Sequence, residues 1–144
     1  MAAALKEAGI AGDAGEVPVG AVLVEAASGK IVARAHNLTE KNCDPTAHAE
    51  ILAIRAGCAQ AGAPRLPDYD LYVTLEPCAM CAAAIAGARI RRLYFGAYDP
   101  KGGAVDHGPR IFDQPTTHHS PEIYGGMDED ASRALLQDFF KERR

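Results

Sequence analysis

Two short stretches decide how this chain folds and where its reactive side chains lie: Thr46-Ala47-His48-Ala49-Glu50 and Leu75-Glu76-Pro77-Cys78-Ala79-Met80-Cys81. Together they offer the imidazole of His48, two thiols three residues apart and the carboxylate of Glu50. A structural zinc site uses four protein ligands, whereas a catalytic zinc site uses three and leaves the fourth position open. The two stretches therefore predict one catalytic Zn²⁺ per chain, with the carboxylate left over as a base.

The residues around the ligands predict that both stretches begin helices. Asp44-Pro45 is typical of a helix N-cap followed by proline at the first helical position, so we expect a helix from there to about Ala61. Pro77 predicts a second helix start, with the two thiols one turn apart on the same face. Successive helical residues turn by about 100°, so His48 and Glu50 can share a site only at the end of their helix. We therefore expect two helix N-termini to meet at the metal, where their positive partial charge favours thiolates.

Each stretch alone has a simpler interpretation. A lone His at a helix start is usually a hydrogen-bonded polar residue, and Cys-x-x-Cys in an intracellular chain can be a redox pair. The combination of His-x-Glu with Pro-Cys-x-x-Cys is instead the signature of zinc deaminases, in which the Glu moves protons and does not bind the metal. This signature assigns His48, Cys78 and Cys81 as metal ligands and Glu50 as the catalytic acid and base.

The two stretches belong to a wider resemblance. Residues 44–50, 74–81 and 99–104 resemble the bacterial tRNA-specific adenosine deaminases, within the cytidine deaminase-like superfamily, and residues 17–22 and 138–141 narrow the match. The resemblance implies conversion of adenosine to inosine in tRNA, at the wobble position of the anticodon stem-loop, by a homodimer. A deaminase of free guanine, cytosine or cytidine is the alternative, because it would share every metal-binding residue.

Asn37 is the leading candidate for contact with the substrate. An Asn just past a strand is often a turn residue. The resemblance implies that this Asn binds the target base, to which an amide offers both a donor and an acceptor. It also implies substrate-binding roles for a further set of residues, namely Ala49, Asp99, Lys101, His119, Lys141, Arg143 and Arg144.

Composition bounds the class of protein. The chain of 144 residues, 48% hydrophobic and 24% charged, predicts a single globular domain over residues 1–144. No apolar run approaches the roughly 18 residues of a membrane span, and the first residues lack the pattern of a signal peptide. We therefore expect a cytoplasmic protein without membrane contact, in which the four cysteines stay reduced.

The net charge of −4 does not by itself favour a nucleic-acid substrate, because phosphate binding usually accompanies a basic balance. Two local basic clusters offset this objection: Arg89, Arg91 and Arg92, and then Lys141, Arg143 and Arg144. If the substrate is RNA, we expect these clusters and Lys101 to contact its phosphates. The alternative is that they only solvate a strand start and the chain end.

Apolar patterning predicts the remaining elements. Strands are expected over residues 17–25, 31–35, 70–75 and 92–96, with a short fifth over 122–125, and a glycine-containing turn joins the first two as a hairpin. The fourth strand follows a helix and should run parallel to the third. A weak first helix is expected within residues 1–15 because three glycines interrupt it. A last helix should begin at Asp128 and bury most of its stripe of Leu135, Leu136, Phe139 and Phe140.

These elements predict an α/β fold, a three-layer α/β/α sandwich around a mixed sheet of about five strands. The alanine-rich stretch after Cys78 should pack closely against another backbone, either in the core or at a dimer face. The long segment from residue 97 to residue 120 should help to form the wall of the substrate cleft, as the resemblance implies.

Overall fold

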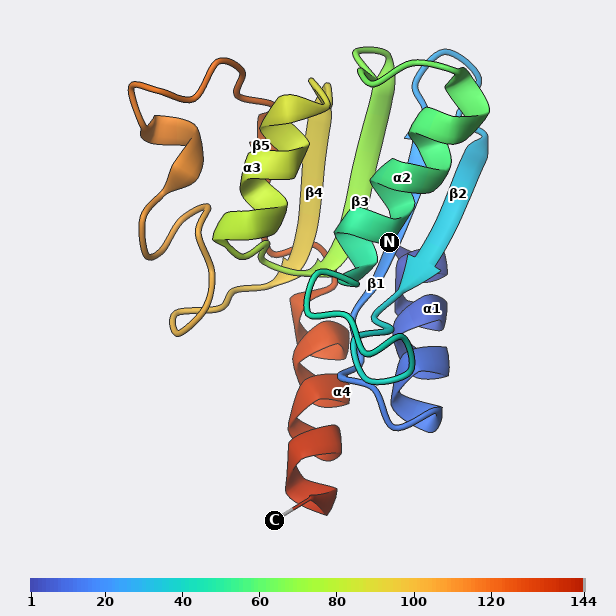
Figure 1. The fold of residues 1–144 in the computed structure, drawn as a ribbon. Helices are drawn as coiled ribbons and strands as arrows, with labels where there is room; N and C mark the ends of the chain where they lie inside the picture. The colour runs from blue at the N-terminus through green and yellow to red at the C-terminus, as the bar shows by residue number, and fades with distance from the viewer. Residues whose placement is uncertain (144) are drawn as a thin grey trace.

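A five-stranded mixed sheet forms the centre of the molecule, whose computed structural model describes residues 1–143 (Figure 1). The strands lie in the order β2-β1-β3-β4-β5 and comprise β1 (Gly20–Glu25), β2 (Ile31–His36), β3 (Tyr69–Leu75), β4 (Arg92–Ala97) and β5 (Glu122–Tyr124). Strand β1 is antiparallel to β2 and β3, whereas β3, β4 and β5 run parallel. The predicted hairpin, the mixed sheet and the parallel pairing of the third and fourth strands are confirmed.

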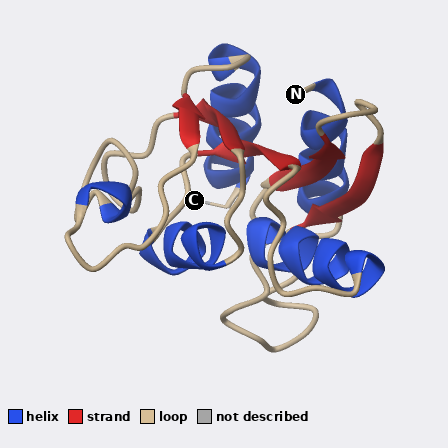
Figure 2. Ribbon diagram, turned by 90° about the horizontal axis from the view of Figure 1, so that it is seen from above, coloured by secondary structure: helices blue, strands red, loops and turns tan. Residues whose placement is uncertain are grey.

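Helices cover both faces of the sheet (Figure 2). Helices α1 (Ala2–Asp13) and α4 (Glu129–Glu142) pack together on one face, and α2 (Ala49–Ala61) and α3 (Ala79–Gly87) pack together on the other. A short 3₁₀ helix, η1 (Ile111–Asp113), lies beside α3. This arrangement confirms the predicted α/β/α sandwich.

Alternating strand residues explain why both faces can be covered. Leu71 and Leu93 are fully buried with Ile85 of α3, whereas the neighbouring Tyr72 and Tyr94 stack on the opposite face with ring centroids 4.3 Å apart. At Gly20, a Cβ atom would overlap the backbone of α1, so the absence of a side chain lets this helix lie directly on β1. That contact also explains why α1 forms a helix of 12 residues despite its glycines, since packing outweighs propensity.

Both helices of the metal-binding stretches begin later than predicted. Helix α2 begins at Ala49, not at Pro45, because Asp44 Oδ1 accepts hydrogen bonds from Thr46 N at 2.8 Å and Thr46 Oγ1 at 2.7 Å and so closes a turn. His48 is left as an extended N-cap with φ −74° and ψ 152°. Cys78 has the same role at the start of α3, with φ −73° and ψ 175°.

The last helix is less buried than predicted. Phe139 is only 8% exposed, but Phe140 is 49% exposed because α4 projects past one end of the strands (Figure 1). The carboxyl ends of β3 and β4 lie together at this end of the sheet, because the two strands are parallel. Within residues 1–143, no helix combines the length and the apolarity that a membrane span requires.

Candidate active site

The starts of two helices bring the predicted ligands together at the carboxyl ends of β3 and β4. His48 precedes α2, Cys78 precedes α3, and Cys81 lies in the first turn of α3. The ligand atoms all lie within 4.8 Å of one another. Burial of Cys81 and partial burial of the other two keep the cluster away from bulk water. The three predicted ligands therefore form one compact donor set.

The distances within this set fit a tetrahedral zinc ion. His48 Nδ1 lies 3.7 Å from Cys78 Sγ and 3.5 Å from Cys81 Sγ. With Zn–S bonds of about 2.3 Å and Zn–N bonds of about 2.0 Å, tetrahedral coordination separates nitrogen and sulfur ligands by about 3.5 Å. Two sulfurs and one imidazole nitrogen are a donor set that zinc prefers. The donors therefore match zinc in both spacing and chemistry, and three ligands leave one position open.

The protonation of the thiols follows from their contacts. The hydrogen bond from Cys81, aided by His48, lowers the pKa of the Cys78 thiol to about 4, so this sulfur is a thiolate at neutral pH. The same contact with Cys78, together with burial, raises the pKa of the Cys81 thiol. The two sulfurs thus share a single proton at neutral pH, and a bound cation would stabilise both of them as thiolates.

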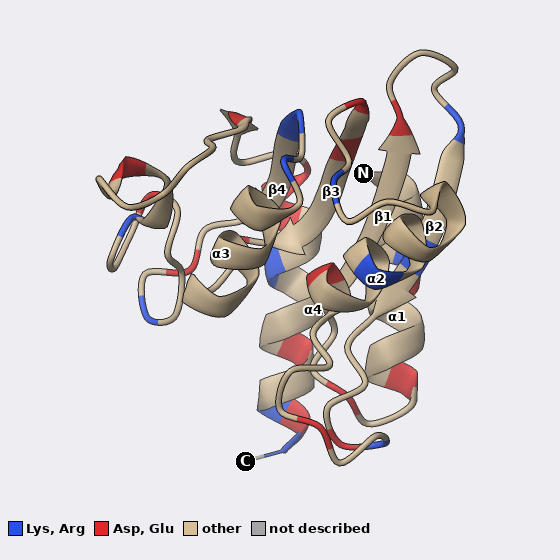
Figure 3. Cartoon of the chain, turned by 45° about the horizontal axis from the view of Figure 1, so that its top comes forward, with Lys and Arg blue, Asp and Glu red and all other residues tan. Residues whose placement is uncertain are grey.

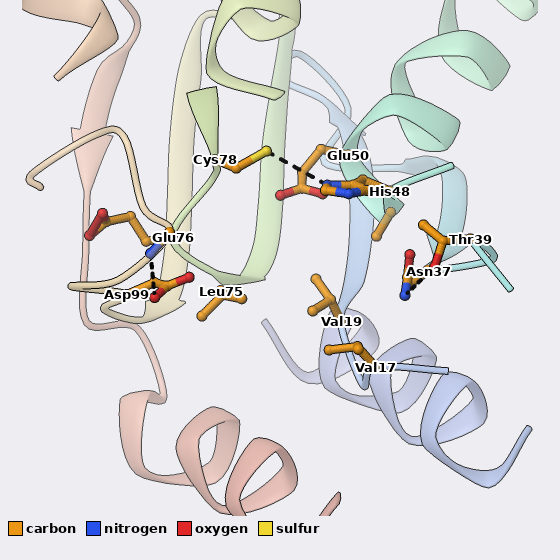
Figure 4. A pocket seen from close by; sticks show the side chains of 12 residues that line it. Val17, Val19, Asn37, Thr39, His48, Glu50, Leu75, Glu76, Cys78 and Asp99 are labelled. Atoms are coloured by element: carbon orange, nitrogen blue, oxygen red, sulfur yellow. Dashed lines mark hydrogen bonds between the residues drawn. The ribbon is translucent and has the colours of Figure 1, made fainter. Parts of the chain in front are cut away.

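Glu50 lies beside these ligands without belonging to their set. It is the second residue of α2, it is 4% exposed, and its carboxylate lies next to the contact between His48 and Cys78 (Figure 4). Burial raises the pKa of this carboxyl group. A carboxylate whose pKa is raised by burial is suited to accept and return protons near neutral pH.

A cavity of about 260 Å³ opens in front of these groups (Figure 4). Among the predicted substrate-binding residues, Asn37, Ala49 and Asp99 line it, together with apolar side chains that include Val17, Val19 and Leu75. Lys101 lies on the Asp99 loop and lines an adjoining hollow that also reaches Leu136 and Phe140 of α4. The cavity thus combines apolar walls with a few polar groups, as small-molecule sites commonly do.

Sequence reasoning missed a buried acid among the residues that line this cavity. Glu76 is 2% exposed, lines the cavity, and accepts a hydrogen bond from His107 Nδ1 at 2.8 Å. A Cβ atom on Gly103 would overlap this carboxylate and the carbonyl of Asp99, so the loop reaches its position only with glycine there. The sequence signal that could have identified Glu76 is its position, because it directly follows the buried strand β3 and lies two residues before the ligand Cys78.

A second buried acid, Glu16, was also missed. It is 2% exposed and accepts hydrogen bonds from the loop that follows β2, including one from Lys41 N at 2.8 Å. Its sequence signal was weak, because a single acid before an apolar run usually lies at the surface.

The structure places several predicted contacts away from the cavity. His119 Nε2 bonds to the carbonyl of Ile90 at 2.7 Å, beyond the opposite end of β4. Lys141 and Arg143 lie at the far end of α4, where the Arg143 guanidinium stacks 3.6 Å from the ring centroid of Phe139. Arg144 falls outside the described residues.

The two basic clusters do not form one patch. Arg91 pairs with Asp70 at 2.7 Å and Arg92 pairs with Glu122 at 2.6 Å. Both pairs lie at the amino ends of β3 and β4, away from the cavity. Basic and acidic residues are interspersed over the fold, and the basic end of α4 is far from the start of β4 (Figure 3). Arg91 and Arg92 therefore lie far from the cavity and from the end of α4, and their expected contact with RNA phosphates stays a prediction.

The geometry defines a zinc-dependent deaminase site, and comparisons with known proteins agree. Residues 1–97 match the family model described as the cytidine and deoxycytidylate deaminase zinc-binding region. The chain is 58% identical to a tRNA-specific adenosine deaminase of Agrobacterium fabrum over 144 residues, which cover 100% of this chain and 93% of that protein.

Solved structures extend these comparisons. One, from a study of A-to-I editing by tRNA:A34 deaminases at the wobble position, has a TM-score of 0.92 and 58% identity over 94% of this chain and 97% of that chain. A guanine deaminase from Bacillus subtilis is more distant, with a TM-score of 0.66 and 32% identity over 97% of this chain and 88% of that one. The chain therefore belongs to the tRNA-specific adenosine deaminase family, within the cytidine deaminase-like zinc deaminases.

Proposed function

We propose that this protein deaminates adenosine to inosine in tRNA, at the wobble position of the anticodon. The full-length similarity to a tRNA-specific adenosine deaminase carries the proposal, because it accompanies an intact set of zinc ligands and an adjacent buried carboxylate. The similarity to a guanine deaminase is weaker, at 32% identity, but a free-base deaminase would use the same metal ligands. It makes guanine the comparison substrate in any test.

In this proposal the reaction is hydrolytic, and Glu50 moves the protons. Zinc held by His48, Cys78 and Cys81 supplies a Lewis acid that lowers the pKa of a water to about 7. Glu50 accepts a proton as the water oxygen bonds to C6 of adenine, and returns it to N1 of the ring. Glu50 then carries the second water proton to the amine. The C6–N6 bond breaks, ammonia leaves, and C6 keeps the oxygen.

The cavity walls would hold the base in place for this chemistry. Asn37 and Ala49 line the cavity together with Glu50 and are assigned to the base. Asp99 and Lys101, on the loop across the cavity, are assigned to the sugar and phosphate side. The more distant phosphates of the stem-loop are assigned to Lys141, Arg143 and Arg144. The substrate-binding role of His119 rests on the family resemblance alone.

The same proposal names the partners of the enzyme. The substrate is the anticodon stem-loop, and the working unit is a homodimer of chains that each form one deaminase domain. Exposed Ala83 and Gly87 on α3, beside a hollow lined by Ile111 and Gln114, supply the small-residue face for a second copy. The described cysteines are all free, which fits the reducing cytoplasm.

The deciding experiment measures ammonia release by the zinc-loaded protein from four substrates. These are an anticodon stem-loop with adenosine at the wobble position, the same RNA with guanosine there, free guanine and free cytidine. We expect release from the first RNA alone, with inosine at that position by sequencing. Turnover of guanine or cytidine without turnover of the RNA would replace this proposal with the free-base alternative. Sedimentation in the same buffer tests the dimer.

A further inference from the structure

Glu16 forms a buried anchor for the loop that carries Asn37. Its carboxylate accepts hydrogen bonds from Lys41 N at 2.8 Å and Glu40 N at 3.2 Å. Thr39 Oγ1 and Asn37 Nδ2 donate longer bonds to the same group, at 3.5 Å and 3.4 Å. A charged group buried to 2% exposure is costly unless it is satisfied in this way, so these donors hold it in place.

The carboxylate also fixes which way the Asn37 amide faces. An ionised carboxylate can only accept hydrogen bonds, so it attracts the NH₂ end of the amide and repels the oxygen end. Asn37 Nδ2 accordingly points to Glu16 and to Thr39 Oγ1, the latter at 3.5 Å. Asn37 Oδ1 is buried and has no hydrogen-bond partner within residues 1–143. An unpartnered buried oxygen in a residue that lines the cavity marks a place for a donor from the substrate.

We propose that Glu16 is a positioning residue that sets the hydrogen-bond polarity of the base pocket. By holding the Asn37 amide in one orientation, it makes the pocket present an acceptor, which selects a bound nucleoside with an N–H or O–H group at that point. Glu16 does not line the cavity itself, so it acts through Asn37. This inference rests on the proposed function for the identity of the substrate, but the coupling between the two residues does not.

Three variants test the coupling: Glu16→Gln, Asn37→Asp and the double variant. Glu16→Gln frees the amide to turn over, and we expect kcat/KM for the stem-loop to fall about tenfold, mainly through KM. Asn37→Asp sets two buried carboxylates against each other, and we expect a loss of about a hundredfold. In the double variant the new amide at position 16 can donate to the new carboxylate at position 37, whose other oxygen still faces the substrate. We therefore expect the double variant to be at least about tenfold more active than Asn37→Asp alone.

Zinc content and thermal unfolding are measured for every variant, and Glu25→Gln at the far end of β1 is the matched control, expected to keep wild-type kcat/KM. Rescue in the double variant with unchanged zinc supports the positioning role. Losses that simply multiply in the double variant overturn it, because a purely structural anchor gives no rescue. If the wild type instead turns over a free base, the proposed function fails, and the same cycle is measured on that base.

Discussion

Two walls of the cavity are built in different ways. The wall with the metal ligands comes from two helix starts, in which the reactive side chains lie within a few residues of one another: His48 with Glu50, and Cys78 with Cys81. A second wall joins the segment before β1 to the loop after β2, and hydrogen bonds to Glu16 hold that loop. The first wall is assigned to the chemistry and the second to the choice of base. Variants in each wall should therefore fail in different ways.

The largest effect is expected at the metal wall. Cys78→Ser removes a sulfur ligand, so the protein should lose its zinc, and activity should fall further than the roughly 10⁴-fold limit for loss of a general base. Metal analysis of the purified variant alongside the deamination assay checks this. Cys58→Ser is the control, because Cys58 lies on α2 away from the ligands and should keep zinc. Full zinc and activity in Cys78→Ser would remove that thiol from the ligand set.

Glu50→Ala should separate chemistry from metal binding within the same wall. The carboxylate is not one of the three converging ligands, so the variant should retain zinc while kcat falls by about 10²- to 10⁴-fold. Metal content and single-turnover rates measure the two properties independently. Loss of zinc together with activity would make Glu50 a ligand and would end the distinction between the two roles.

Gly103→Ala should affect the loop across the cavity while leaving the metal in place. The added Cβ atom would overlap the Glu76 carboxylate, so the loop with Asp99 must shift, at a cost of about 1–3 kcal/mol in unfolding free energy. We expect reduced kcat/KM with zinc retained. Gly9→Ala is the matched control, because its added Cβ meets nothing within 4 Å beyond its chain neighbours and the nearby backbone of its own helix, and alanine favours a helix by about 1 kcal/mol. Equal stability changes of the same sign in both variants would contradict the overlap.

The difference between the walls also explains what the sequence could predict. The ligands and Glu50 were predictable because zinc chemistry restricts residue type and spacing. The first residue of each helix was not, because Asp44 closes a turn with Thr46 instead of capping the helix. The roles of Glu16 and Glu76 depend on partners 21 to 31 residues away, which no local pattern reveals.

The placement of the basic residues in the fold was likewise not predictable from the sequence. The sequence predicted phosphate contacts for Arg91 and Arg92 and for the C-terminal basic residues, but it did not show whether the two clusters lie together. Because α3 carries the chain back across the sheet, β4 starts at the opposite edge, and both guanidinium groups there pair with acids. The residue types and spacing of the ligands therefore predicted the zinc site, whereas no pattern in the sequence predicted where the two basic clusters lie in the fold.

The smallest expected effect belongs to Lys141, which lies beyond both walls. It sits near the exposed end of α4 with Phe140, on the helix whose Leu136 and Phe140 border the hollow next to the cavity. Each phosphate that a protein neutralises on a single strand contributes about 0.7 to the slope of log K against log salt. Lys141→Ala should therefore flatten the slope for stem-loop binding by about 0.7 and weaken binding modestly, with zinc and kcat unchanged.

Lys30→Ala is the control for this measurement, because Lys30 lies in the β1–β2 turn at the other end of the molecule (Figure 1). Binding titrations of both variants from low to moderate salt give the two slopes. An unchanged slope in Lys141→Ala would show that α4 does not reach the phosphates, and the substrate would then be held by the cavity loops alone. An equal change in both variants would instead indicate attraction by net charge, since a direct contact depends on position and net charge does not.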